Sequence, residues 1–388
     1  MTEDPTAAHQ PLAGLKVMEI GTSVAAPYAG WVLGALGADV VKVERAGTGD
    51  DARQWGRMFP DGSSSTFHSL NRDKRSVTVN LRDEGERAWL RGLCVREADI
   101  VLQNMRPGRI ESYGLGALDL TGENPGLIYC NLWAYGSRGP LKDKPGYDPL
   151  MQACGGLMSV TGEEGRPPIR VGTSIIDMGS GLWCVIGILA ALNNRHRTGR
   201  GCVIDASLYE TSLAWMTTHV PAVQIDGQVP TRQGSGVRGM APYQAYLCAD
   251  GYLVVAAPND NLFNRLAAVL GHPEWPEDPR FDTNQKRSTN LDELNELIAP
   301  ILAVEPRAHW QEKLDTAGVP SAPVQNAVEM MGHPQTEALG IIQELDGQGP
   351  RLMGVPLSFD GERPPMRRPA PKLGEHNEDI KGGTGGAD

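Results

Sequence analysis

The chain opens with a short apolar run, a helix-like stretch and a second short apolar run, in that order. The first run is Leu15–Ile20, the helical stretch begins at Pro27 and ends at Gly37, and the second run is Ala38–Glu44. Pro favours the first turn of a helix and Gly favours its end, so these two residues mark the helix limits. Two strands joined by a helix lie parallel in one sheet, and this β-α-β unit therefore predicts a parallel sheet.

The same alternation continues through the first half of the chain. Arg75–Leu81, Ala98–Gln103 and Gly126–Trp133 fit further strands, and Glu84–Glu97 fits a helix between two of them. Arg170–Ile176 fits another short strand. Alternating strands and helices predict an α/β fold with a Rossmann-like, doubly wound large domain.

The second half of the chain begins with a different pattern. Tyr243–Ala249 and Tyr252–Ala257 fit strands that flank Asp250-Gly251, a dipeptide typical of a hairpin turn. Helices are expected at Asn261–Leu270 and Leu291–Leu302, which completes a smaller α+β domain. Gly349–Ser358 fits a late strand that returns to a sheet. We therefore place the large domain at 1–225, the small domain at 226–330, and a C-terminal segment that returns to the large domain at 331–388.

Composition limits the partners that such a chain can bind. Its 388 residues include 36 Lys and Arg against 47 Asp and Glu, which gives a formal net charge of −11. Binding to nucleic acid or to an anionic membrane needs clustered positive charge, so we expect neither partner. A small anionic ligand needs only a local basic patch, and the net charge does not exclude one.

The N-terminus and the cysteines are those expected in a reducing compartment. The first residues, MTEDPTAAHQP, are polar and acidic, unlike a secretory signal. The longest apolar run, around Leu182–Leu192, is too short for a membrane span and predicts a buried helix. The six cysteines have no spacing typical of metal ligands. We therefore expect a cytoplasmic protein without a bound metal.

Motifs of several common enzyme classes are absent. No G-x-G-x-x-G follows the first predicted strand, where Gly30, Gly34 and Gly37 have a spacing typical of helix packing. The P-loop, the G-x-S-x-G elbow of α/β-hydrolases and the H-E-x-x-H zinc motif are also missing. Nicotinamide binding and these three chemistries are therefore not expected.

The segment RVGTSIIDMGSG, Arg170–Gly181, is the best candidate for a site. An apolar run leads to Asp177, the small residues of Met178–Gly181 leave space for a ligand, and an apolar helix follows. Ligands of open α/β sheets bind at the carboxyl ends of the strands, and a helix N-terminus favours an ionised carboxylate. Asp177 is therefore either a carboxylate of a ligand site or the residue that caps the helix.

Basic residues gather around the predicted strands of the first domain. Those that follow the second, third and fourth strands are expected near one edge of the sheet, where they suit a phosphorylated cofactor. The alternative is a set of solvated surface charges. The residues are Arg45, Arg72, Lys74, Arg75, Arg82 and Arg106.

Longer blocks of sequence follow one another from Leu12 to Asn377. They include LKVMEIGTSVAAPYAGWVLGALGADVVKVER, NRDKRSVTVNL, NMRPGRIESYGL, KPGYDPLMQACGG and IIDMGSGLWCVIGILAAL. In these blocks the chain resembles the class III coenzyme A transferases, the CaiB/BaiF family. The resemblance implies a Rossmann-like large domain built from both chain ends, a smaller domain inserted late, and a homodimer of two interlocked subunits.

The resemblance also implies a reaction, with the family's catalytic aspartate at Asp177. CoA passes from an acyl-CoA donor to a free carboxylic acid, typically a small or dicarboxylic one. The carboxylate forms a mixed anhydride with the acyl group, the released CoA thiolate converts it to an aspartyl-CoA thioester, and the acceptor acid reverses these steps. No metal takes part. The loop around Gly234–Gly239 matches the position of the family's mobile lid.

Contacts to CoA are implied for the first β-α turn, for basic residues near the phosphates, and for loops beside the pantetheine arm. Pro145 replaces a Lys seen in some members, and Lys142 or Lys144 is then the alternative phosphate contact. Lys74 and Arg75 either bind phosphate or only anchor their strand. The implied CoA-binding residues are Val24, Ala25, Arg45, Lys74, Arg75, Arg82, Asn104, Met105, Arg106, Tyr147 and Asp148.

Two other functions suit the same scaffold. An α-methylacyl-CoA racemase carries Gly-His-Asp where this chain has Gly146-Tyr147-Asp148, and a Tyr with an ordinary pKa of about 10 is a poor replacement for the His base. A non-catalytic acyl-CoA-binding protein would not need Asp177. For the transferase, Arg170 or Arg238 is the candidate partner of a second carboxylate on the acid.

Overall fold

The computed structural model describes residues 10–345 and 348–382. Internal contacts divide the chain into two compact units. Unit 1 comprises the described residues of 1–157, 170–227 and 334–388, and unit 2 comprises 158–169 and 228–333. Residues 158–169 thus group with unit 2, whereas the boundaries proposed from the sequence place them in the large domain.

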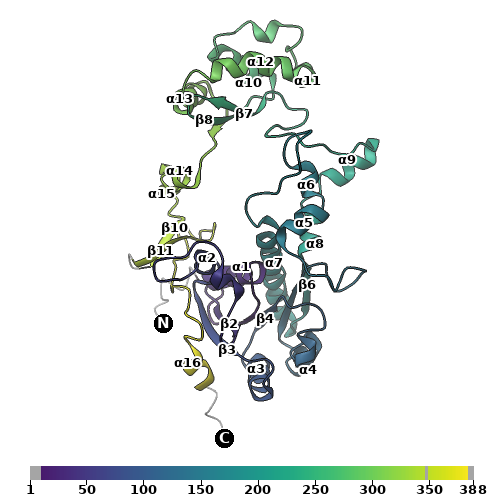
Figure 1. The fold of residues 1–388 in the computed structure, drawn as a ribbon, viewed down its shortest axis with the longest axis vertical. Helices are drawn as coiled ribbons and strands as arrows, with labels where there is room; N and C mark the ends of the chain where they lie inside the picture. Colours follow the sequence, from purple (N-terminus) through teal and green to yellow (C-terminus); the bar gives the residue numbers. More distant parts are fainter. Residues whose placement is uncertain (1–9, 346–347, 383–388) are drawn as a thin grey trace. The chain divides into compact units, whose positions relative to one another are not determined.

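Unit 1 is built around a six-stranded sheet in which every neighbouring pair of strands is parallel (Figure 1). The strand order is β3-β2-β1-β4-β5-β6, the order typical of a Rossmann fold. The predicted parallel α/β sheet is therefore confirmed. The strands are β1 Lys16–Ile20, β2 Asp39–Arg45, β3 Lys74–Val79, β4 Ile100–Gln103, β5 Ile128–Trp133 and β6 Val203–Ser207.

Helices cover both faces of this sheet. One apolar core lies between the sheet and helices α1 and α7, and a second lies between the other face and helices α3 and α4. The helices of unit 1 are α1 Ala25–Ala35, η2 Asp51–Gln54, α2 Ser65–Asn71, α3 Glu84–Arg96, η3 Glu111–Tyr113, α4 Ala117–Glu123, α5 Asp148–Cys154, α7 Ile175–Thr198, α8 Leu208–Ala214, α9 His219–Asp226, α15 Pro334–Ala338 and α16 Asn377–Gly382. The short α6, Leu157–Val160, lies at the boundary of the units.

Helix α7 begins earlier than the sequence pattern suggests. The predicted strand at Arg170–Ile176 does not form, and the helix starts at Ile175. The reason is a cap from elsewhere in the chain, because the backbone N–H groups of Ile176 and Asp177 donate to the Asp148 carboxylate.

Helix α7 is long and apolar enough to cross a membrane by length and composition alone. Half of its most apolar stretch is buried in the protein, as in a core helix.

The C-terminal segment packs beside β3. The backbone N–H of His376 donates to the Ser76 carbonyl at 3.0 Å, and the N–H of Thr78 donates to Asn377 Oδ1 at 2.9 Å. The predicted late strand overlaps β11 (Gln348–Met353), which pairs antiparallel with β10 (Ile342–Leu345) in a separate two-stranded sheet. It therefore does not extend the parallel sheet.

Unit 2 contains the predicted hairpin, with β7 and β8 paired antiparallel and β9 added beside β8. Helices pack on this sheet around an apolar core that includes Phe263, Trp275 and Trp310. Its elements are β7 Tyr243–Cys248, β8 Gly251–Ala256, α10 Asp260–Val269, η4 Trp275–Glu277, α11 Asn284–Thr289, α12 Leu291–Leu302, α13 Arg307–Ala317, β9 Ser321–Pro323 and α14 Ala327–Met331.

Candidate functional site

Strands β1 and β4 are neighbours at the centre of the sheet, and the chain leaves them toward helices on opposite faces. Such a switch point is where open α/β sheets bind ligands, outside the carboxyl ends of the strands. The Asn104 side chain joins the two loops here, since its Oδ1 accepts from Thr22 N at 3.0 Å and its Nδ2 donates to Thr22 O at 2.8 Å. Asn104 thus fixes the β1–α1 turn as well as bordering the site.

The β1–α1 turn, Gly21–Pro27, has an unusual backbone. Ser23 has a φ of 73°, in the left-handed region that residues other than glycine rarely adopt. Val24 follows as the N-cap of α1, with no side-chain cap, and is half-buried, while Ala25 is buried. Backbone held in such a conformation clusters at ligand sites.

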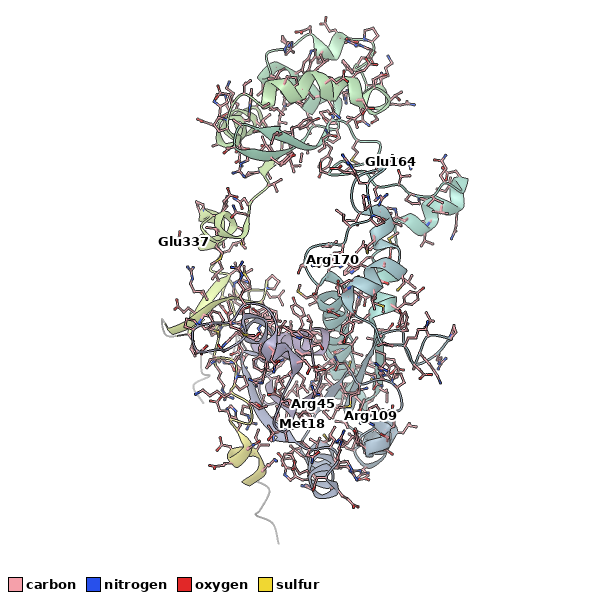
Figure 2. The ribbon with its side chains drawn as sticks, viewed as in Figure 1. Met18, Arg45, Arg109, Glu164, Arg170 and Glu337 are labelled. Carbon is pink, nitrogen blue, oxygen red and sulfur yellow. The ribbon has the colours of Figure 1, made fainter. Side chains whose placement is uncertain are left out.

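Three predicted phosphate-binding arginines lie on the surface at this edge. Arg45 ends β2 and donates to Asp51 Oδ1 at 2.6 Å, with 60% of its side chain exposed (Figure 2). Arg82 follows β3 and Arg106 follows β4, and both are exposed. Met105, beside Arg106, is half-buried and its N–H donates to Gln103 Oε1 at 2.7 Å. The carboxyl ends of the strands therefore bring these residues to one edge.

Lys74 and Arg75 do not belong to this group, because both sit at the amino end of β3. The Lys74 ammonium is fully buried and pairs with Glu19 at 2.7 Å. Arg75 donates to both carboxylate oxygens of Asp39, at 2.9 and 2.5 Å, at the amino end of β2. Of the two interpretations of these residues, the structure supports anchoring of the strand.

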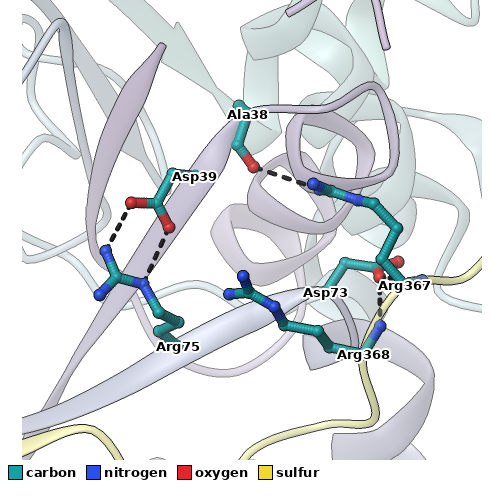
Figure 3. A pocket seen from close by; sticks show the side chains of 6 residues that line it. All are labelled: Ala38, Asp39, Asp73, Arg75, Arg367 and Arg368. Carbon is teal, nitrogen blue, oxygen red and sulfur yellow. Dashed lines mark hydrogen bonds and ion pairs between the residues drawn. The ribbon is translucent and has the colours of Figure 1, made fainter. Parts of the chain in front are cut away.

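A small pocket of about 200 Å³ lies beside Arg75 (Figure 3). Asp73 Oδ1 accepts there from the backbone N–H groups of Arg367 and Arg368, at 2.6 and 2.9 Å, and Arg367 also donates to the Ala38 carbonyl. Of the three guanidinium groups that line the pocket, that of Arg75 is paired with Asp39. This arrangement joins the C-terminal segment to the amino edge of the sheet.

Asp177 lies in the first turn of α7 and is half-buried. It does not cap the helix. Asp148, nearly fully buried, does so, since its Oδ2 accepts from Ile176 N at 2.7 Å and from Asp177 N at 3.2 Å. Gln152 holds Asp148 in place by donating to its Oδ1 at 2.5 Å. Within residues 10–345 and 348–382, no hydrogen bond is donated to the Asp177 carboxylate.

The electrostatic setting of Asp177 differs from the sequence expectation. Burial, and then the negative charge of Asp148, raise the pKa of Asp177 to about 7. The favourable effect of the helix N-terminus on the ionised form is thus outweighed. A carboxylate whose pKa lies near neutrality, and which no donor stabilises, is suited to nucleophilic attack or proton transfer.

Two glycines after Asp177 pack closely against neighbouring elements on the side where a side chain would lie. A Cβ on Gly179 would lie 2.8 Å from the Trp215 ring, and a Cβ on Gly181 would lie 2.7 Å from the Ala25 carbonyl oxygen. Gly181 therefore lets α7 approach the start of α1. In this way the helix that bears Asp177 packs directly against the β1–α1 turn.

The other predicted site residues are exposed. Tyr147 is 61% exposed immediately before α5, and Arg170 donates to the carbonyl oxygens of Val171 and Gly172 (Figure 2). Arg238 is exposed in unit 2, whereas Arg170 belongs to unit 1. The pairing of either arginine with an acid substrate stays a prediction.

Sequence reasoning missed the charged residues beneath the turn, which are Glu19, Lys42 and Asp50. A signal was present, since Glu19 and Lys42 interrupt apolar runs that otherwise predict buried strands. Among the described residues, no group of three or more His, Cys, Asp or Glu side chains has an arrangement that could hold a metal ion.

Comparisons with known proteins identify the family. The profile of CoA-transferase family III matches residues 12–377. The chain is 37% identical to the succinyl-CoA–D-citramalate CoA-transferase of Chloroflexus aurantiacus, over 96% of this chain and 93% of that protein. It is 36% identical to the acetyl-CoA:oxalate CoA-transferase of Acetobacter aceti, over 98% of each.

A solved structure agrees with this result. The crystal structure of a CaiB/BaiF family protein from Brucella suis is similar with a TM-score of 0.89 and 36% identity, over 97% of this chain and 99% of that chain. The resemblance seen in the sequence blocks is thereby confirmed. The chain belongs to CoA-transferase family III and is a CoA-transferase.

Proposed function

We propose that this enzyme transfers CoA from an acyl-CoA donor to a free carboxylic acid through covalent intermediates on Asp177. The observation that carries the proposal is the Asp177 carboxylate itself. It receives no hydrogen bond from the described residues, its pKa is raised to about 7, and its helix packs against the β1–α1 turn. A carboxylate without donors is a stronger nucleophile than one stabilised by them.

The reaction proceeds by two acyl transfers and their reversal. A carboxylate oxygen of Asp177 attacks the thioester carbon, the C–S bond breaks, and a mixed anhydride and the CoA thiolate result. The thiolate attacks the Asp177 carbonyl carbon, releasing the donor acid and leaving an aspartyl-CoA thioester. The acceptor carboxylate then attacks that thioester, and the thiolate takes the acyl group from the new anhydride, which regenerates Asp177.

The carboxyl edge of the sheet provides the CoA site in this proposal. Val24 and Ala25 contribute backbone contacts, and Asn104 and Met105 border the pantetheine arm. Arg45, Arg82 and Arg106 face solvent at the same edge, as phosphate ligands require. Tyr147 and Asp148 complete the site next to Asp177, while Lys74 and Arg75 are omitted because they lie at the amino end of β3.

The acceptor is proposed to be a dicarboxylic acid. Citramalate and oxalate, named for the two relatives above, both carry two carboxylates. One carboxylate reacts, and the other needs a positive partner, for which Arg170 and Arg238 are the candidates. A panel of mono- and dicarboxylic acids, assayed with succinyl-CoA and acetyl-CoA as donors, identifies the substrate.

We also propose that the enzyme is an interlocked homodimer. Helix α7 exposes Leu182, Trp183, Ile186 and Leu189, a spacing that places them along one face. Neighbouring elements expose Leu213 and Trp215 as well. Apolar patches of this kind usually mark protein interfaces, and a second copy of the chain is the partner that the family implies.

We further propose a cytoplasmic location, which the six free cysteines fit.

Trapping tests the covalent route. The enzyme is incubated with succinyl-CoA alone, quenched with hydroxylamine and digested, and the peptides are analysed by mass spectrometry. A hydroxamate at Asp177 is expected. In steady-state assays Asp177→Ala should lose at least about a thousandfold in kcat and still bind CoA, because a nucleophile is lost and the CoA contacts are not.

The control variant is Asp143→Ala, which removes an exposed carboxylate and should trap and turn over normally. Normal transfer by Asp177→Ala would refute the covalent route. Exchange of the substrate α-proton with deuterated water, in the absence of any acceptor acid, would instead favour the racemase.

A further inference from the structure

Two lysines and two carboxylates lie buried together between the sheet and the first turn of α1. Glu19 comes from β1, Lys42 from β2 and Lys74 from β3, while Asp50 precedes η2. None of the four is more than 1% exposed. Buried ion pairs usually add little net stability compared with well-packed apolar side chains, so their presence calls for another explanation.

Lys42 connects the group to the end of β1. Its ammonium lies 2.9 Å from Glu19 Oε1 and 2.8 Å from Asp50 Oδ2, and donates to the Gly21 carbonyl at 3.0 Å. The Lys42 ammonium donates two hydrogen bonds, to Glu19 and Gly21, and its contact with Asp50 is an ion pair. Burial alone would lower the pKa of Lys42, but the carboxylates of Glu19 and Asp50 raise it, so the residue stays charged.

Lys74 connects the same group to the first turn of α1. Its ammonium lies 2.7 Å from Glu19 Oε2 and donates to the Pro27 carbonyl at 2.8 Å and to Asn71 Oδ1 at 2.9 Å. Glu19 therefore bridges both lysines. Helix α1 lies directly on this carboxylate, since a Cβ on Gly30 would be 1.9 Å from Glu19 Oε2.

Asp50 holds the middle of the turn. Its Oδ1 accepts from Ser23 N at 3.0 Å and from Ala52 N at 2.9 Å, while its Oδ2 faces Lys42. Ser23 is the residue with the left-handed backbone, a conformation that persists only where its surroundings impose it. The hydrogen bond from Ser23 N to the anchored carboxylate is such a constraint.

The three contacts to backbone fall on the two ends and the middle of a single turn. They reach the carbonyl of Gly21, the N–H of Ser23 and the carbonyl of Pro27. We propose that Glu19, Lys42, Asp50 and Lys74 are positioning residues that hold the turn Gly21–Pro27 in its CoA-binding conformation before CoA arrives. This inference rests on the proposed function, in which Val24 and Ala25 of this turn contact CoA.

If the turn is already ordered, CoA binding does not have to pay the conformational-entropy cost of ordering it. The four residues do not touch CoA themselves, so their removal should weaken CoA affinity and leave the reactivity of Asp177 intact. A rise in KM for acyl-CoA at nearly constant kcat is therefore expected, in contrast to the loss of kcat expected for Asp177→Ala.

The test measures CoA dissociation constants by calorimetry, with CoA as the probe, together with the Tm of each variant. Asp50→Ala should bind CoA about tenfold more weakly, because the turn then relaxes. Adding Ser23→Gly should restore much of the affinity, since glycine adopts a positive φ without strain. The Tm values separate this rescue from a general folding defect, in which affinity would recover only to the extent that Tm recovers.

Asp39→Ala is the matched control. Asp39 lies at the other end of β2, pairs with Arg75 and makes no contact with the turn, so its removal should leave CoA affinity within about twofold. If Asp50→Ala fails to fold, Asp50→Asn serves, because its Oδ1 still accepts from Ser23 N and only the ion pair is lost. It should weaken binding less than Asp50→Ala.

Equal CoA affinity in the wild type and in the folded Asp50 variant would overturn the inference. A Ser23→Gly substitution that leaves the Asp50→Ala defect unchanged would do the same. Failure of the wild-type enzyme to bind CoA would instead refute the proposed function, so the two failures are distinguishable.

Discussion

The two edges of the parallel sheet hold similar charged side chains with different surroundings. At the carboxyl edge, Arg45 faces solvent beside Asp51, and no residue that the structure describes donates a hydrogen bond to the Asp177 carboxylate. At the amino edge, Arg75 is bound by Asp39, and Asp73 accepts from the backbone of Arg367. The carboxylate and the exposed arginines of the proposed site thus lie at the carboxyl edge, whereas Asp39 and Asp73 at the amino edge accept hydrogen bonds from within the protein.

Lys74 and Arg75 show that two basic residues adjacent in sequence can have different surroundings in the fold. They are consecutive residues of one strand, and successive side chains of a strand point to opposite faces of the sheet. Lys74 therefore joins the buried group beneath α1, while Arg75 lies in the pocket beside the C-terminal segment. A basic pair in a sequence is not evidence for a phosphate site until its strand positions are known.

The largest effect that would test the difference between the two sheet edges is expected from changing the charge beside Asp177. Since the pKa of Asp177 is raised to about 7, kcat/KM for succinyl-CoA should rise with pH and level off above that value. Asp148→Asn removes the like charge beside Asp177. The acidic limb of the kcat/KM profile should therefore shift to lower pH by about one unit. Burial, the larger cause, remains, and the pKa of Asp177 should therefore stay above that of an ordinary Asp.

Asp143→Asn, at an exposed carboxylate, serves as the control for this pH profile and should leave the limb unmoved. Stability provides a second readout. A raised pKa means that the folded state binds the extra proton between about pH 4 and 7, so stability should fall as pH rises through that window. A pH limb that stays in place in Asp148→Asn would contradict the assignment of Asp148 as a cause.

A smaller effect is expected at the exposed arginine of the carboxyl edge. Arg45→Gln should raise KM for succinyl-CoA about threefold at low salt, and the difference should shrink at about 0.5 M salt because exposed charges are screened. Asp51→Asn frees Arg45 from its partner and should lower KM slightly. Equal KM values for the wild type and Arg45→Gln at low salt would remove this residue from the CoA site.

The smallest kinetic effect is expected at the amino edge. Arg75→Gln should leave KM and kcat within about twofold, while the loss of the two hydrogen bonds to Asp39 should cost about 1 kcal/mol of folding stability. Thermal unfolding and steady-state kinetics on one preparation measure both. A clear rise in KM without a loss of stability would show that the amino edge also serves CoA.

The alternating pattern was sufficient to predict the sheet, because its strands are short apolar runs bounded by charges and turns. It failed where distant residues decide the structure. Helix α7 starts at Ile175 because Asp148, which lies 28 residues before Ile176, accepts from the Ile176 N–H, and no local signal reveals that partner. The resemblance singled out Asp177, whose catalytic role stays a prediction, but the pKa of that residue depends on burial that only the fold creates.

The C-terminal segment has a consequence for how the chain is made. Residues near 368–377 complete the hydrogen bonding of Asp73, Ser76 and Thr78, so β3 acquires these partners only after about 300 further residues have been synthesised. The helices and hairpin of unit 2, by contrast, come from one continuous stretch, 228–333. During synthesis, the continuous stretch 228–333 can therefore fold before β3 has met the C-terminal residues that complete its hydrogen bonds.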